Sequence, residues 1–149
     1  MTNEDDVSIL NRIKSIYYDS YIINEVISKI PEIQIIANLR CGKWYCSNSN
    51  VKTCYFKSTD GHRNKWDFNT RRLNMNVLEL AFIKKSICII DATANHRKIY
   101  PDALSKTIPI WIYVINAYIE KHIKKSTDDT VNETIKLPRF IDNAEQKDL

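Results

Sequence analysis

A stripe of isoleucines at helical spacing fills the first thirty residues and constrains the fold more than any other feature. Positions 9, 13, 16, 20, 23, 27 and 30 alternate steps of three and four, and all are Ile except Ser20. This spacing predicts one amphipathic helix that packs along the stripe. Pro31 is expected to close the helix, because proline disfavours helical geometry in the residue before it.

Short β-branched and aromatic runs follow this helix. Residues 33–36, 43–46, 54–58 and 86–93 are predicted to be strands, and 71–85, which lacks Gly and Pro, a helix. A second strong helix is expected from Pro109 to Lys125, with proline in its first turn. The order predicts an α/β fold: a single domain with a small mixed sheet flanked by helices, and amphipathic helices near both ends. The buried stripe predicted for the last helix consists of Ile108, Trp111, Ile112, Ile115, Ile119 and Ile123.

The length of 149 residues suits one domain with a real core. We expect residues 1–125 to form that domain and the polar residues 126–149 to be a linker or tail. No apolar run approaches the roughly 20 residues of a membrane span, and the acidic start MTNEDDVS carries no secretory pattern. We therefore expect a cytoplasmic protein without a membrane partner.

Cys41, Cys46, Cys54 and Cys88 allow either metal binding or burial as thiols. Their spacings, C-x4-C, then C-x7-C and a distant fourth, match no familiar zinc finger. Free cysteine is usually a small core residue, so we expect reduced thiols and no zinc. A metal-bound structural or interaction domain is an alternative that depends on the cysteines alone.

Positive charge gathers in one quarter of the chain. Eight Lys or Arg and two Asp lie between Asn38 and Asn74, so this stretch carries +6 while the whole chain carries +4. Aromatic residues alternate with these cations, which suits RNA because rings stack on bases and cations meet phosphates; most of these rings can instead belong to the core. The residues expected to contact RNA are Arg40, Lys43, Trp44, Arg63, Lys65 and Trp66.

Two predicted strand ends hold side chains that suit catalysis, FKSTDGH at 56–62 and IIDATANHRK at 89–98. Ligands of open α/β sheets bind beyond the carboxyl ends of strands, so we expect these two loops to face each other across a positively charged cleft. Asp60, His62 or Asp91 could act as a base. His62 could instead be an ordinary loop histidine, and Asp91 could cap the following loop.

The step from Asp60 to Gly61 allows a tight turn whose backbone N–H groups can bind an anion. An ordinary hairpin turn with solvated charges is the alternative. Arg71 and Arg72 are expected to begin the next helix, whose N-terminal amides also favour anions. The predicted phosphate ligands are Lys57, Ser58, Thr59, Gly61, Arg71, Arg72, Thr93 and Arg97.

Several long strings resemble the initiator-tRNA phosphoribosyltransferase family of fungi, plants and some other eukaryotes. They are ANLRCGKWYC, YFKSTDGHRNKWDFNTRRLNMNVLEL and CIIDATANHRKIYPDALSKTIPIWIYVIN, with the later LPRF. The resemblance is firm over 37–116. It implies transfer of a ribosyl phosphate from phosphoribosyl pyrophosphate to the 2′-hydroxyl of an adenosine in the T-stem of initiator tRNA, which keeps that tRNA out of elongation.

The resemblance also implies a requirement for Mg²⁺, for which Asp91 or Asp102 could supply a carboxylate. It implies that the tail leads toward a second, phosphatase-like domain that this sequence does not contain. An RNA-binding remnant without catalytic activity, which keeps the basic surface but lacks part of the active site, is the alternative to the transferase.

Overall fold

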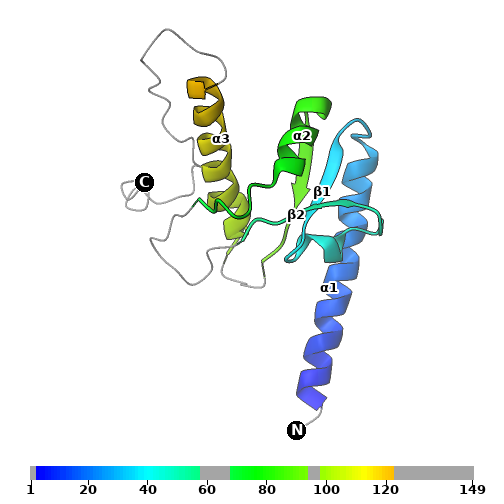
Figure 1. Cartoon of the computed structure of the whole chain (residues 1–149). Coiled ribbons are helices and arrows are strands. Elements are labelled where there is room, and N and C mark those ends of the chain that lie inside the picture. The colour runs from blue at the N-terminus through cyan, green and yellow to red at the C-terminus, as the bar shows by residue number, and fades with distance from the viewer. Residues whose placement is uncertain (1–2, 58–67, 94–97, 123–149) are drawn as a thin grey trace. The chain divides into compact units, whose positions relative to one another are not determined.

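The computed structural model describes residues 3–57, 68–93 and 98–122 (Figure 1). The chain divides into two compact units, which we describe separately. The first consists of Met1–Tyr55 and Asn74–Ala92, and the second of Phe56–Leu73 and Thr93–Leu149. None of the helices in the described ranges is both long and apolar enough to cross a membrane.

A three-stranded sheet organises the first unit. Strands β1 (Gln34–Asn38), β2 (Lys52–Cys54) and β3 (Ile87–Ile90) pair in the order β2-β1-β3. Both pairings are parallel, with Ala37 opposite Thr53 on one side and opposite Ile90 on the other. The α/β class is confirmed. Within the described strands the sheet is parallel, where we had expected a mixed one.

Strand β1 is the centre of the core because it has a partner on each side. Ile36, Ala37 and Asn38 have no exposed surface, as a strand in the middle of a parallel sheet requires. Helix α2 (Met75–Lys84) contributes Val77 and Leu80 to the same core and leads directly into β3. These two residues are three positions apart and form the buried face of α2.

Helix α1 (Asn3–Ser28) confirms the first predicted helix and ends just before Pro31. Only part of its isoleucine stripe is covered by other residues. Ile16, Ile23 and Ile27 are partly covered, and the helix packs against the short 3₁₀-helix η1 (Gly42–Tyr45). Ile9 and Ile13 remain more than half exposed, and Figure 1 shows this end of α1 extending beyond the sheet.

Three predicted boundaries were wrong. Residues 43–46 belong to η1 and the residue after it, not to a strand. Strand β2 spans Lys52–Cys54, earlier than the predicted 54–58. Helix α2 begins at Met75, not at Arg71, because Asn74 in the left-handed region precedes it (φ 47°). Asn69 forms a turn over Arg71 and Arg72 instead, with its Oδ1 accepting from the Arg71 N–H at 2.9 Å.

The second unit is built on helix α3 (Ile108–His122), which follows the π-helical segment η2 (Ala103–Thr107). Ile108 and Trp111 are buried as predicted. Ile112 was predicted to belong to the same buried stripe, and this was wrong, because it is 45% exposed. Trp111 packs edge-on against Phe56 with ring centroids 5.4 Å apart. Its indole N–H also donates to the Leu73 carbonyl at 2.8 Å.

Candidate functional site

Asp91 lies directly after β3, beside the carboxyl end of β1. The chain leaves β1 for β2 on one side and later enters β3 on the other, so the strand order reverses between β1 and β3. Ligands of open α/β sheets bind at such a reversal, beyond the carboxyl ends of the strands. This position makes the predicted Asp91 the centre of the candidate site.

Hydrogen-bond donors from three segments hold the Asp91 carboxylate. Asn38, the last residue of β1, donates from Nδ2 to Oδ2 at 2.9 Å. The backbone N–H of Ala92 donates to Oδ1 at 2.9 Å, and the backbone N–H of Gly42 donates as well. Because these donors come from β1, the segment after β3 and η1, the carboxylate has one defined orientation.

Gly42 is required by close packing at this point. A Cβ placed on it would lie 1.8 Å from the carbonyl oxygen of Ile90, which is the last residue of β3. Only a residue without a side chain lets the backbone of η1 approach β3 so closely. The same approach brings the Gly42 N–H to Asp91.

The electrostatics of the site favour a basic carboxylate. Desolvation by burial raises the pKa of Asp91 and outweighs four lowering influences, which are the hydrogen bonds from Asn38, Ala92 and Gly42 and the charge of Arg40. A carboxylate with a raised pKa accepts a proton more readily than an ordinary aspartate. A raised pKa and a fixed orientation are two features that a general base can use.

Three of the four cysteines of this unit have a raised thiol pKa. Burial, with a further contribution from the Asp91 charge, raises the pKa of Cys54 to about 12. Burial also raises the pKa of Cys46 and Cys88. In the part of the chain that the structure describes, no cluster of three or more His, Cys, Asp or Glu is arranged to hold a metal ion.

An exposed basic and aromatic surface adjoins the Asp91 site through η1. Arg40 and Lys43 are exposed, and the Trp44 side chain is 72% exposed. These are three of the six residues predicted to contact RNA. We name this surface, formed by Arg40, Lys43 and Trp44, the η1 face.

Four of the predicted phosphate ligands are among the residues that the structure describes in the second unit, namely Lys57, Arg71, Arg72 and Thr93. The carbonyl of Lys57 accepts from the Thr107 hydroxyl at 2.8 Å, and the neighbouring Phe56 packs on Trp111. Leu73, next to Arg72, is fixed by the Trp111 indole. The start of α3 thus anchors the chain beside Lys57 and beside Arg72. Arg71 and Arg72 precede α2 rather than begin it, so the anion-binding helix terminus predicted for them is wrong. Thr93, also in this unit, is partly covered.

Several predicted site residues lie outside the described residues, so their placement stays a prediction. The expectation that the loops after 57 and after 91 face each other depends on these residues and stays a prediction too. They are Ser58, Thr59, Asp60, Gly61, His62, Arg63, Lys65, Trp66 and Arg97.

Two residues that contact Asp91 escaped the sequence analysis. Asn38 is fully buried, and a polar residue that ends an apolar run is the signal that would have identified it. A buried amide at that place needs a partner, because an unpaired polar group in the core is costly. Gly42 escaped because its contact with Ile90 joins segments far apart in the sequence.

The chain was compared with known proteins. A family model described as the Rit1 N-terminal domain matches residues 2–149. A Saccharomyces cerevisiae protein named tRNA A64-2'-O-ribosylphosphate transferase is 44% identical over 137 residues, which are 91% of this chain and 26% of that protein. An uncharacterized protein of Schizosaccharomyces pombe is 35% identical over 140 residues, 93% of this chain and 30% of that protein. No solved structure matches.

The chain spans between a quarter and a third of the length of these two curated relatives. The family model, in contrast, covers nearly all of the sequence. The chain belongs to the Rit1 N-terminal domain family, as its motifs had indicated.

Proposed function

We propose that the chain takes part in the transfer of a ribosyl phosphate from phosphoribosyl pyrophosphate to the 2′-hydroxyl of an adenosine in the T-stem of cytoplasmic initiator tRNA. The observation that carries the proposal is the 44% identity to a tRNA A64-2'-O-ribosylphosphate transferase over 137 residues. The position of Asp91 at the strand-order reversal supports it.

Asp91 is the proposed general base. The 2′-oxygen of the adenosine forms a bond to C1′ of the donor, while the bond from C1′ to the pyrophosphate oxygen breaks. Pyrophosphate leaves with the electron pair of that bond, and the hydroxyl proton passes to the Asp91 carboxylate. Asn38 and the Gly42 N–H keep the carboxylate aimed, because each donates to it. Asp60 and His62 remain alternative bases.

The leaving pyrophosphate needs positive charge around it, because negative charge develops there in the transition state. Lys57, Arg71 and Arg72 are three of the proposed phosphate ligands, and arginine can bind phosphate through two parallel hydrogen bonds. The remaining proposed donor ligands are Ser58, Thr59, Gly61, Thr93 and Arg97.

Mg²⁺ is part of the proposal, and the two candidate carboxylates suit it unequally. Asp102 is nearly buried and already pairs with the Lys98 ammonium. Asp91 accepts three N–H donors, and a carboxylate has about four lone-pair sites. Its one remaining site can bind the ion only where Asp60 or His62 serves as the base instead. One carboxylate together with substrate phosphates is an ordinary Mg²⁺ site. The ion would neutralise charge on the pyrophosphate.

The η1 face is the proposed tRNA contact in the first unit. Trp44 offers a ring for stacking, and Arg40 and Lys43 offer cations for phosphates. Arg63, Lys65 and Trp66 would extend this contact.

The test is an assay of the 149-residue chain with initiator tRNA, Mg²⁺ and phosphoribosyl pyrophosphate labelled in the ribose. We expect label in the tRNA, and no label with Asp91→Asn. Asp19→Asn on α1 is the control and should transfer normally. Salt-sensitive tRNA binding without transfer would support the RNA-binding alternative, and the absence of both binding and transfer would refute the proposal.

A further inference from the structure

A pocket with polar side chains in its lining opens at the amino ends of β1 and β2, whereas Asp91 lies beyond the carboxyl ends of the strands. It has a volume of about 440 Å³ and is lined by the end of α1, the turn before β1, the loop 46–51 and the first residues of β1 and β2. Gln34 at the start of β1 lies in its wall, whereas Asn38 at the end of β1 belongs to the Asp91 site. Four residues of strand separate the two positions by about 13 Å.

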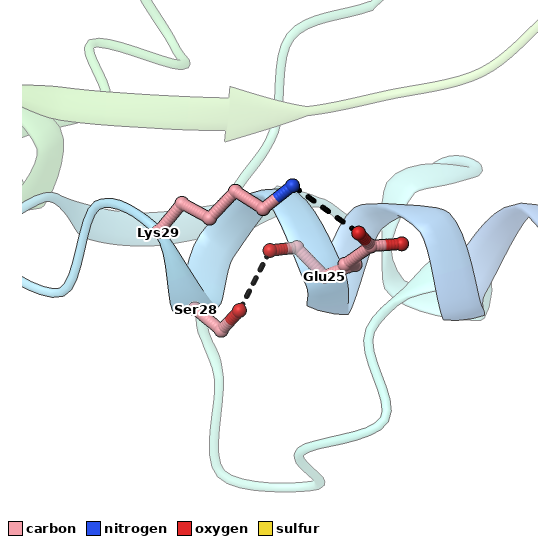
Figure 2. Close-up of polar contacts among 3 residues, drawn as sticks. All are labelled: Glu25, Ser28 and Lys29. Atoms are coloured by element: carbon pink, nitrogen blue, oxygen red, sulfur yellow. Dashed lines mark hydrogen bonds and ion pairs between the residues drawn. The ribbon is translucent and has the colours of Figure 1, made fainter.

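Two lysines that line the pocket have no carboxylate partner among the described residues. Lys52 begins β2 and Lys84 ends α2, and both line the pocket and are exposed. Neither forms an ion pair with any described residue. Lys29 near the same end of α1 differs, because its ammonium pairs with Glu25 at 3.2 Å (Figure 2). Lys52 and Lys84 are therefore available for an anion.

Side-chain amides supply the second kind of ligand group. Asn48 and Asn50 line the pocket and are exposed, and the only contact between them runs from the Asn50 backbone N–H to Asn48 Oδ1 at 2.9 Å. The amide groups of Asn48 Nδ2 and of the Asn50 side chain are thus unused within the described residues. Primary amides pair with the donor and acceptor edges of nucleobases.

The floor of the pocket is apolar. Ile27, Ile33, Ile35 and Val51 line it and are partly buried. An apolar wall with a few directed polar groups is the usual composition of a small-molecule site, and roughly 300–1,000 Å³ is the usual size. A flat base can rest on such a wall while its edge meets the amides.

We propose that this pocket binds one nucleotide unit, with the phosphate at Lys52 and Lys84 and the base edge at Asn48 and Asn50. The unit is either a free nucleoside 5′-monophosphate or one nucleotide of a single-stranded RNA, since both present the same base and phosphate. The pocket is a binding site separate from Asp91, so the proposal goes beyond the proposed transfer. Glu32 also lines the pocket, and its negative charge disfavours a second phosphate.

The test measures binding of labelled AMP, GMP, CMP and UMP, and of a short unstructured RNA, to the 149-residue chain by equilibrium dialysis. We expect saturable binding of at least one probe. Binding should weaken at least about tenfold when Lys52→Glu and Lys84→Glu are combined, because each charge-assisted contact is lost. Lys29→Glu is the matched control and should bind as the unchanged chain does. Asp91→Asn should also bind normally, which separates this proposal from the proposed transfer.

The two probe classes identify the source of the nucleotide. Saturation by a monophosphate assigns a free nucleotide, and saturation by the RNA alone assigns an RNA nucleotide. NMR provides a second readout that does not depend on the variants, because the side-chain amide signals of Asn48 and Asn50 should move on titration. Binding of no probe, equal binding by the double variant, or unmoved amide signals would each overturn the proposal.

Discussion

The Asn38 side-chain amide donates to Asp91 Oδ2 at 2.9 Å and joins the end of the central strand to the residue after β3. Asn38 has no exposed surface, so water cannot replace it. The contact does two things at once. It satisfies a buried amide, and it orients a carboxylate that burial makes more basic. Asn38 is therefore a positioning residue for Asp91 in the proposed reaction.

We expect Asn38→Ala to shift the pH profile of transfer. The Asn38 hydrogen bond lowers the pKa of Asp91, so its loss should raise that pKa further. The base must be ionised to act, so the acidic limb of kcat against pH should move to higher pH. The maximal rate should also fall roughly tenfold, because the carboxylate loses its alignment.

Asn76→Ala is the matched control for this shift. Asn76 also donates its side-chain amide to the sheet, at 2.8 Å from the Thr53 carbonyl, but it makes no described contact with Asp91. The acidic limb of kcat against pH should therefore stay at its original pH in Asn76→Ala. A limb that stays in place in Asn38→Ala would mean that the amide has only a structural role.

Asp91→Asn should abolish transfer without unfolding the protein. The pKa of folded Asp91 is raised, so its contribution to stability is fully present below the ordinary aspartate pKa and is lost as pH rises through the raised value. At neutral pH the ionised carboxylate therefore lowers the free energy of unfolding, and the substitution by Asn removes this destabilising charge. We expect transfer to fall at least about a hundredfold, while urea denaturation at pH 7 shows equal or higher stability.

The pH dependence of unfolding is a separate test of whether folding raises the pKa of Asp91. The stability gap between Asp91→Asn and the unchanged chain should narrow as pH falls from 7 through the raised pKa. A gap that widens toward low pH would show that the pKa of Asp91 is lowered by folding, contrary to the environment described here.

Local patterns in the sequence were enough to identify the three helices and to place Asp91 at the end of a strand. The Ile spacing of α1 and the apolar pair Val77 and Leu80 repeat at helical intervals, and Asp91 ends a β-branched run. Residues 43–46 were wrongly predicted as a strand because the composition of Lys-Trp-Tyr-Cys is typical of strands. The close packing of Gly42 against Ile90 accompanies a 3₁₀-helix there instead. That contact joins segments nearly fifty residues apart, and no local pattern encodes it.

The start of α2 was misplaced for a similar reason. Asn74 donates to the Tyr55 carbonyl at 3.1 Å and accepts from its N–H at 2.9 Å, so it acts as a strand partner for the residue after β2. This double contact holds Asn74 in the left-handed region and delays the helix to Met75. Helix propensity alone predicted a start at Arg71, because propensity takes no account of the contact between Asn74 and the distant Tyr55.

Gly42→Ala should destabilise the fold strongly. The new Cβ would meet the Ile90 carbonyl at 1.8 Å, and backbone on both sides would have to move. We expect a loss of at least about 2 kcal/mol in the free energy of unfolding, measured by urea denaturation. Lys43→Ala at the exposed next position is the control and should change stability by less than about 0.5 kcal/mol. An equally mild effect at Gly42 would show that η1 does not pack on β3.

Trp44→Ala should weaken tRNA binding and leave the fold intact. The Trp44 ring is 72% exposed, so its removal should change the free energy of unfolding by less than about 0.5 kcal/mol. Loss of one stacked base should cost about 1–3 kcal/mol of tRNA affinity, measured by filter binding at fixed salt, and Trp44→Phe should recover part of it. Phe82→Ala on α2 is the matched control, since Phe82 is another aromatic of the same unit and is 76% exposed.

If both substitutions weaken tRNA binding equally, exposed aromatic rings contribute to tRNA affinity wherever they lie, and the η1 face is not the contact. An effect confined to Trp44, together with a shallower salt dependence in Lys43→Ala, assigns the tRNA contact to the surface beside Asp91.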